Sequence, residues 1–132
     1  MIKAALAKEI AIRVQDQVGV LAQVLSPIAE ANLNLKAINT VSLANEAQVR
    51  LIAENTDKVE EVLKSSGYTP WVREVVAVEI ANEAGAVAQV AAKLAEAKID
   101  IKASWASVAD GVNATFYLAT ADNRNALKVL VA

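Results

Sequence analysis

The chain contains neither cysteine nor histidine. Without cysteine it can form no disulfide, no thiolate nucleophile and no metal site built on cysteine. Without histidine it lacks the most common general base and the most common metal ligand. It also has no Gly-rich phosphate-binding loop, and its serines have no evident partner base. We therefore expect a protein that is not an enzyme and that needs no metal or other cofactor.

Positive charge is sparse and scattered along the chain. Thirteen lysines and arginines stand against 15 aspartates and glutamates, for a formal net charge of −2. Nucleic-acid binding requires clustered positive charge, so we expect no nucleic-acid partner. No apolar run reaches the roughly 18 residues of a membrane helix. Residues 1–8 are too short and too interrupted for a signal peptide. These absences predict a cytoplasmic protein without a membrane partner.

What the chain does contain is an internal repeat. The segment Ile10–Gly19 returns as Val76–Gly85, and Leu33–Ala37 returns as Ile99–Ala103. The spacing is constant at 66 residues (85 − 19 and 103 − 37). A repeat of this length predicts two related structural units, which we place at residues 1–74 and 75–132.

Hydrophobic periodicity predicts the elements of each unit. Ile10, Ile12 and Val14 alternate with polar residues, as in a half-buried strand, and the period becomes helical after Gly19. The resulting order is β-α-β-β-α-β, so we predict an α+β fold of two tandem ferredoxin-like units. Strands are expected at 8–15, 35–41, 48–54, 68–73, 75–81, 99–108 and 112–120, and helices at 20–31, from 57 to a stop at Gly67, at 86–97 and at 124–130.

The second unit ends before its last strand. The first strand of that unit would then be unpaired along one edge, which proteins rarely leave bare. We expect the first unit, the N-terminal segment Ile2–Ala7 or a second chain to cover this edge. The third possibility predicts a homodimer.

The junction between the first strand and the first helix resembles that of the ACT-domain family. The family pattern is Asp-x-Pro-Gly after a strand, then Leu-Ala and a helix, then Gly-Ile-Asn-Ile. Here it stands as Asp16–Ala22 followed by Ala31–Leu35, and again as Asn82–Ala88 followed by Ala97–Ile101. The resemblance covers nearly the whole chain, and the tandem arrangement is similar to that of small stand-alone paired ACT proteins.

The resemblance implies a regulatory module that binds a small ligand, usually an amino acid, where two ACT-like units meet. The regulated enzyme would then be a separate chain. The family's ligand loop falls on these residues: Asp16, Gln17, Val18, Gly19, Val20, Leu21 and, in the second copy, Asn82, Glu83, Ala84, Gly85, Ala86, Val87.

The chemistry of such a junction suits a zwitterion. A glycine in the turn lets the backbone approach a ligand closely. Free N–H groups at a helix start can hold a carboxylate, and a nearby Asp or Asn can accept from an ammonium group.

The copies also depart from the family pattern. Neither has proline before the glycine of the turn, and Asp16 becomes Asn82 in the second copy. Asn32 and Lys98 stand where the family has a glycine before the second strand. We therefore expect unequal sites and favour the one that contains Asp16.

Two alternatives need no small ligand. Helix capping alone would account for Asp16 and Asn82, because both residue types are favoured at helix N-termini. The chain could also be a ligand-free interaction or dimerisation module that pairs through the exposed sheet edge.

Overall fold

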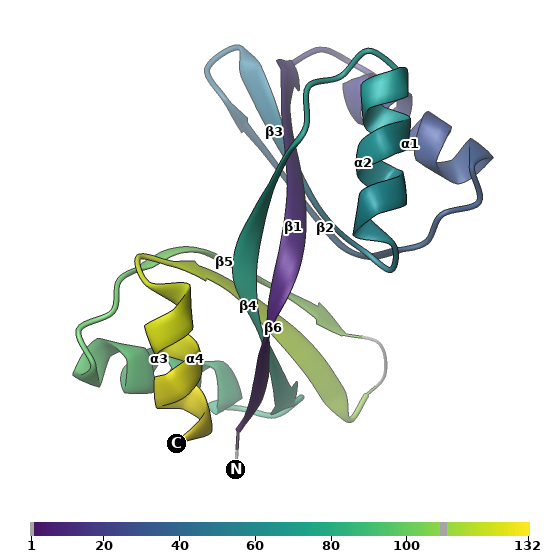
Figure 1. The fold of residues 1–132 in the computed structure, drawn as a ribbon. Coiled ribbons are helices and arrows are strands. Elements are labelled where there is room, and N and C mark those ends of the chain that lie inside the picture. Colours follow the sequence, from purple (N-terminus) through teal and green to yellow (C-terminus); the bar gives the residue numbers. More distant parts are fainter. Residues whose placement is uncertain (1, 109–110) are drawn as a thin grey trace. The chain divides into compact units, whose positions relative to one another are not determined.

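The computed structural model describes residues 2–108 and 111–132, which form two compact units (Figure 1). The first unit comprises residues 8–73. The second comprises the described parts of residues 1–7 and 74–132. Strand β1 (Lys3–Gln15) and strand β4 (Trp71–Ala81) each contribute residues to both units.

The first unit has two helices on one face of its strands (Figure 1). Its strands follow the order β2-β3-β1-β4, and the β2–β3 and β1–β3 pairs are antiparallel. Besides β1 and β4 it contains α1 (Val20–Glu30), β2 (Leu35–Leu43), β3 (Glu46–Ala53) and α2 (Thr56–Ser65). In its core, every second residue of the strands packs against helix residues spaced one turn apart. The core residues are Ile10, Ile12, Val24, Ile28, Val49, Leu51, Ala53, Val59 and Leu63.

The second unit repeats this arrangement in the strand order β1-β4-β6-β5. Besides β1 and β4 it contains α3 (Ala86–Glu96), β5 (Ile101–Val108), β6 (Asn113–Thr120) and α4 (Asn123–Val131). Its core has the same make-up as the first: Val76, Val78, Val90, Leu94, Ile99, Phe116, Leu118, Ala126 and Leu130. The predicted α+β fold of two tandem ferredoxin-like units, the second without a last strand of its own, is confirmed.

The N-terminal segment supplies the missing strand of the second unit. Strand β1 begins at Lys3, five residues before the expected start at Lys8, and its early part lies beside β4. Ile2, Ala4 and Leu6 pack against the second core. The period of two suits a strand with one face on a core. Of the three candidates for covering this edge, the structure uses the chain's own N-terminal segment.

Two local expectations need correction. The helix α2 is capped by Asn55, whose side chain accepts from the Lys58 N–H at 3.1 Å, so the helix begins at Thr56 rather than at residue 57. Strand β4 starts at Trp71 rather than at residue 68, directly after Pro70, which has no N–H for a ladder. The stop at Gly67 is confirmed: this residue has φ 93°, and the next N–H bonds back to Leu63 at 3.0 Å.

Candidate functional site

Both repeated junctions start their helix in the same unusual way. Gly19 precedes α1 with φ 88° and ψ −2°, and Gly85 precedes α3 with φ 88° and ψ −11°. Neither helix has a side-chain cap, whereas Asn55 caps α2 and Asp122 caps α4. The left-handed turn at glycine thus leaves the first-turn N–H groups of α1 and α3 without a side-chain acceptor.

Capping is therefore the wrong explanation for Asp16 and Asn82. The Asp16 carboxylate accepts a hydrogen bond from the Ser42 hydroxyl, near the end of β2. The Asp16 backbone N–H also donates to the carbonyl of Asn45 at 2.8 Å. Together these bonds tie the loop after β1 to the turn between β2 and β3.

The second junction keeps only half of this arrangement. The Asn82 N–H donates to the carbonyl of Val112 at 2.8 Å, which matches the backbone bond of Asp16. The position that corresponds to Ser42, 66 residues later, is Val108. Because valine has no hydroxyl, the side-chain link cannot form there, and the two junctions differ in this link as well as in the charge at the position of Asp16.

Of the other residues expected to bind a ligand, those in the turns are exposed and most of those at the helix starts are buried or half-buried. In the first junction Gln17, Val18 and Gly19 are exposed, whereas Val20 is buried and Leu21 packs against the core. In the second junction Glu83, Ala84, Gly85 and Val87 are exposed and Ala86 is half-buried. The side chain of Val20 is buried and its N–H donates to the carbonyl of Gln17 at 3.1 Å, so a ligand at the first junction would meet the exposed turn residues instead.

Both units keep a left-handed backbone at the position before the second strand, where the ACT-domain pattern has glycine. Asn32 has φ 58° and Lys98 has φ 59°, in the left-handed region that favours glycine. Both residues link a helix to the following strand. The backbone shape that the family achieves with glycine is kept here by two other residue types.

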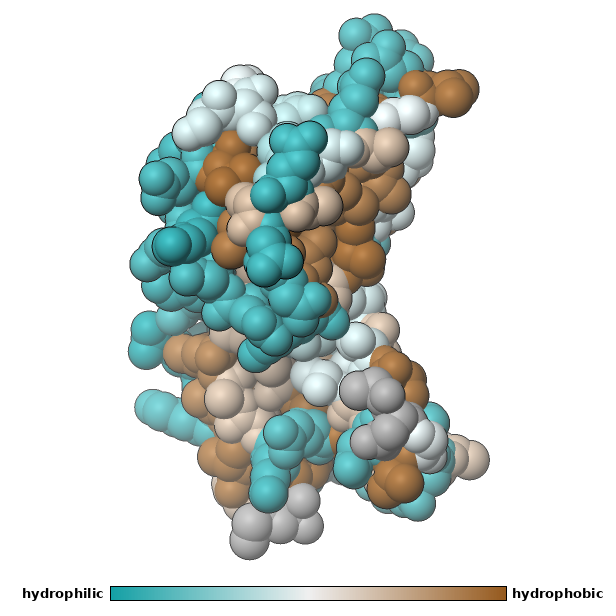
Figure 2. All heavy atoms as spheres, turned by 90° about the vertical axis from the view of Figure 1, so that its right-hand side faces the viewer, coloured by the Kyte–Doolittle hydropathy of each residue, from teal (hydrophilic) through white to brown (hydrophobic). Residues whose placement is uncertain are grey.

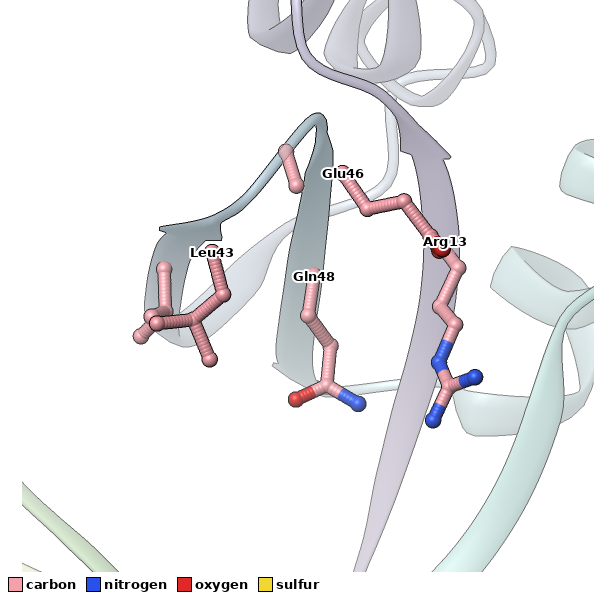
Figure 3. A pocket seen from close by; sticks show the side chains of 6 residues that line it. Arg13, Leu43, Glu46 and Gln48 are labelled. Atoms are coloured by element: carbon pink, nitrogen blue, oxygen red, sulfur yellow. The ribbon is translucent and has the colours of Figure 1, made fainter.

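A pocket of about 200 Å³ lies on the sheet of the first unit (Figure 3). Arg13 on β1 pairs with Gln48 on β3, which in turn pairs with Val41 on β2. The neighbours Ile12 and Val49 point into the helix-covered core, so these three point to the other face. The pocket is lined by Arg13, Val41, Leu43, Glu46, Ala47 and Gln48.

A line of polar side chains leads away from this pocket. The amide oxygen of Gln48 accepts from Arg50 Nε at 3.1 Å and from a terminal guanidinium nitrogen at 2.8 Å. The fully buried Glu9 carboxylate lies 4.0 Å from Arg50 Nε and 2.7 Å from Arg73 Nε. Burial, followed by the nearby charge of Arg73, lowers the pKa of Arg50, and Glu9 opposes that shift.

None of the residues that line this pocket was expected as a site residue from the sequence. Its one available signal was Arg13, because the repeat places Glu79 at the corresponding position. The other lining residues come together only through the pairing of three strands.

The surface mixes polar and apolar groups, with hydrophobic side chains in patches among hydrophilic ones (Figure 2). Strand β2 carries three of the exposed large apolar side chains, Ile38, Val41 and Leu43, and it is the edge strand of the first unit. Within residues 2–108 and 111–132, no helix is long and apolar enough to cross a membrane. In the same part of the chain, no three acidic side chains gather as a metal site would require.

Comparison with known proteins gives a family match and several structural relatives. A family model described as "ACT domain pair" matches residues 5–132. No curated protein sequence matches the chain. Protein BT0572 from Bacteroides thetaiotaomicron is 25% identical in sequence and superposes with a TM-score of 0.89, over 97% of this chain and 88% of that one.

Two further relatives are described as regulatory subunits of aspartate kinase. The ligand-free protein from Thermus thermophilus is 17% identical, with a TM-score of 0.70, over 97% of this chain and 94% of that one. The protein from Thermus flavus is 15% identical, with a TM-score of 0.64, over 98% of this chain and 94% of that one. At these identities the likeness concerns the fold.

Proposed function

We propose that this chain, which belongs to the ACT domain pair family, is a regulatory module that binds a free amino acid at its strand–helix junctions. The observation that carries the proposal is the uncapped start of α1 and α3 behind a left-handed glycine. N–H groups at a helix start attract a carboxylate through both hydrogen bonding and the helix dipole. The two helices outside the junctions have side-chain caps and lack this opening.

Asp16 gives the first junction a partner for the other end of an amino acid. Its carboxylate is exposed in the loop and held in place by Ser42. The ammonium group of a bound amino acid would contact this oxygen, and its carboxylate would accept from the N–H groups at the start of α1. The junction would then bind both charged groups of the ligand. Asn82 carries no charge, so the second junction binds the same ligand more weakly.

Regulation would follow from linkage between the ligand and a partner. If the ligand changes the affinity of the protein for a partner by some factor, the partner changes the affinity of the protein for the ligand by the same factor. We propose that the partner is an enzyme on a separate chain, that the chain acts as a homodimer, and that it works in the cytoplasm. The structural relatives described as regulatory subunits of aspartate kinase support a regulatory role of this kind.

Calorimetric titration with each of the 20 standard amino acids tests the proposal. We expect one amino acid, or a few of similar side chain, to bind in the micromolar to millimolar range, and the others to give no heat. No binding by any of them at millimolar concentration would overturn amino-acid sensing.

A second candidate function is a docking module without a small ligand. It is favoured by the edge strand β2, whose Ile38, Val41 and Leu43 side chains are exposed. An apolar edge strand is a template for pairing with another strand. Light scattering after size-exclusion chromatography separates the two functions. Self-association that Leu43→Lys abolishes, in a protein that binds no amino acid, would favour the docking module.

A further inference from the structure

We propose that the pocket on the sheet of the first unit is a second ligand site, which takes an α-amino acid with an aliphatic side chain. This pocket, lined by Arg13, Val41, Leu43, Glu46, Ala47 and Gln48, is separate from the strand–helix junctions in residue content. The site therefore goes beyond the proposed function and does not depend on it.

Size limits the ligand to a small metabolite. The pocket measures about 200 Å³. Sites for drug-sized ligands and cofactors usually span roughly 300–1,000 Å³, so a nucleotide or a flavin exceeds this one. An amino acid of the size of valine or leucine suits the space.

Arg13 provides the charge that a carboxylate requires. Its guanidinium lies 5.9 Å from the centroid of the Trp71 ring, a cation–π contact that holds the side chain against an aromatic face. Among the residues that the structure describes, no carboxylate lies within ion-pair distance of Arg13. Its hydrogen-bonding fork remains open to a ligand, and such a fork matches the two oxygens of a carboxylate.

Gln48 adds a second donor with a fixed orientation. Because Arg50 donates twice to its Oε1, the amide cannot flip without losing both bonds. The Nε2 group is therefore directed away from Arg50, and Figure 3 shows it on the side of Gln48 where Arg13 lies. Two donors from neighbouring strands thus flank one space, where a carboxylate can accept from both.

The remaining lining residues account for the rest of the ligand. Val41 and Leu43 offer an apolar surface, with the Leu43 side chain on the opposite side of Gln48 from Arg13 (Figure 3). Glu46 supplies a carboxylate at the rim, which pairs with an ammonium group. The guanidinium of Arg13 would bind the ligand's carboxylate and Glu46 its ammonium group. The aliphatic lining residues would contact an apolar side chain, so the three contacts together specify an apolar amino acid.

The corresponding face of the second unit has different chemistry. The strand pairs Arg13–Gln48 and Val41–Gln48 correspond there to Glu79–Thr115 and Ser107–Thr115. The cation becomes an anion, and the aliphatic residue becomes a serine. The repeat thus retains the scaffold but not the recognition groups, and the site belongs to the first unit alone.

Titration of the full chain with leucine, followed by calorimetry and amide NMR shifts, tests this site. We expect leucine to shift the amide signals of residues 13, 41 and 48, and Arg13→Gln to weaken that binding by at least about tenfold, since a charge-assisted contact is lost. Glu79→Gln is the matched control on the other unit and leaves leucine affinity unchanged. An unaltered NMR spectrum of unliganded Arg13→Gln shows that the variant is folded.

Two further experiments distinguish binding in this pocket from binding at the junctions, and binding of an amino acid from binding of other carboxylate ligands. Asp16→Ala leaves the leucine-induced shifts at 13, 41 and 48 in place; shifts confined to residues 16–21 would overturn the pocket and support the junction. The 2-oxo acid of leucine, which has no ammonium group, binds the wild type more weakly, and Glu46→Gln removes that preference. Equal wild-type affinity for the two compounds would overturn the assignment of an amino acid.

Discussion

The hydroxyl of Ser42 donates a hydrogen bond to the carboxylate of Asp16, linking the end of β2 to the loop that precedes α1. The second unit has Val108 and Asn82 at these positions, so it has neither the hydroxyl nor the charge. A near-exact repeat at the level of fold therefore carries two junctions of different chemistry. The first has a side-chain anchor and a negative charge at this position, and the second has neither there.

The first prediction follows from this link. Asp16→Ala removes the acceptor for a ligand's ammonium group, so amino-acid affinity at the first junction should fall about tenfold or more. Ser42→Ala keeps the charge but loses the anchor, and should weaken binding less. Asn82→Ala is the matched variant in the second junction and should leave the stronger site intact. An Asp16→Ala variant with altered stability and unaltered affinity would contradict the ligand role.

The glycines of the two turns are expected to resist substitution for a backbone reason. A Cβ at Gly19 or Gly85 would meet nothing within 4 Å, but both residues have φ +88°. Gly19→Ala and Gly85→Ala should each lower the free energy of unfolding by about 1–2 kcal/mol, because an L side chain is strained in that region. Chemical denaturation measures this. Gly111→Ala, also in open space and without positive φ, should be close to neutral.

The strand supplied by the N-terminus should be needed for the stability of the second unit. Leu6→Asn removes a half-buried side chain that packs on the second core and should cost roughly 1–1.5 kcal/mol, about half the value for full burial. Ala5→Asn changes the adjacent, exposed position of the same strand and should cost far less. Equal effects of the two substitutions, measured by denaturation, would contradict the packing of this segment.

The buried and exposed ion pairs should differ sharply in their contribution. Glu9 is fully buried between Arg50 and Arg73, so Glu9→Gln leaves two arginines without their shared counter-charge. We expect a loss of about 2–3 kcal/mol, below the range of about 3–5 kcal/mol for a fully buried pair, because the Arg50 and Arg73 side chains are 17% and 35% exposed. Glu74 forms an exposed pair with Arg124 at 3.1 Å, and Glu74→Gln should cost about 0–1 kcal/mol. A comparable loss in both variants would argue against the burial of Glu9.

The buried phenol of Tyr117 should make the protein less stable to unfolding at alkaline pH. Burial raises the pKa of its phenol above the ordinary value of 10.0, and its ring stacks on Trp105 with centroids 5.9 Å apart. The unfolded chain releases this proton first, so stability is unaffected below pH about 10 and falls as the pH rises through the raised pKa. Tyr117→Phe should remove this part of the pH dependence. Denaturation curves measured across the alkaline range provide the comparison.

Local patterns were enough to predict most of the fold. Alternation around Ile10 and Ile12 and helical spacing around Val24 and Ile28 identified the elements of the first unit, and all four residues lie in its core. The same patterns in the second copy identified its elements. These signals succeed because each core needs one apolar face from every strand and helix.

The starts of α1 and α3 were predicted correctly, but the alternative that Asp16 caps α1, which rested on residue type, is wrong. Asp16 has the residue type of a cap but lies three positions before Gly19, which occupies the cap position in a left-handed turn. Its carboxylate instead meets Ser42, which is 26 residues away in the sequence. The general preference of aspartate for helix caps cannot reveal a hydrogen-bond partner that only the folded structure brings close.

The sequence by itself determined that there are two related units, the order of their elements, the family, and the chemical difference between Asp16 and Asn82. Those properties are recorded in residue type and periodicity along one chain. The tertiary structure decided which segment completes the second unit and which side chains meet in the pocket around Arg13. Both depend on pairing between distant strands, and many pairings satisfy the same local pattern until packing selects one.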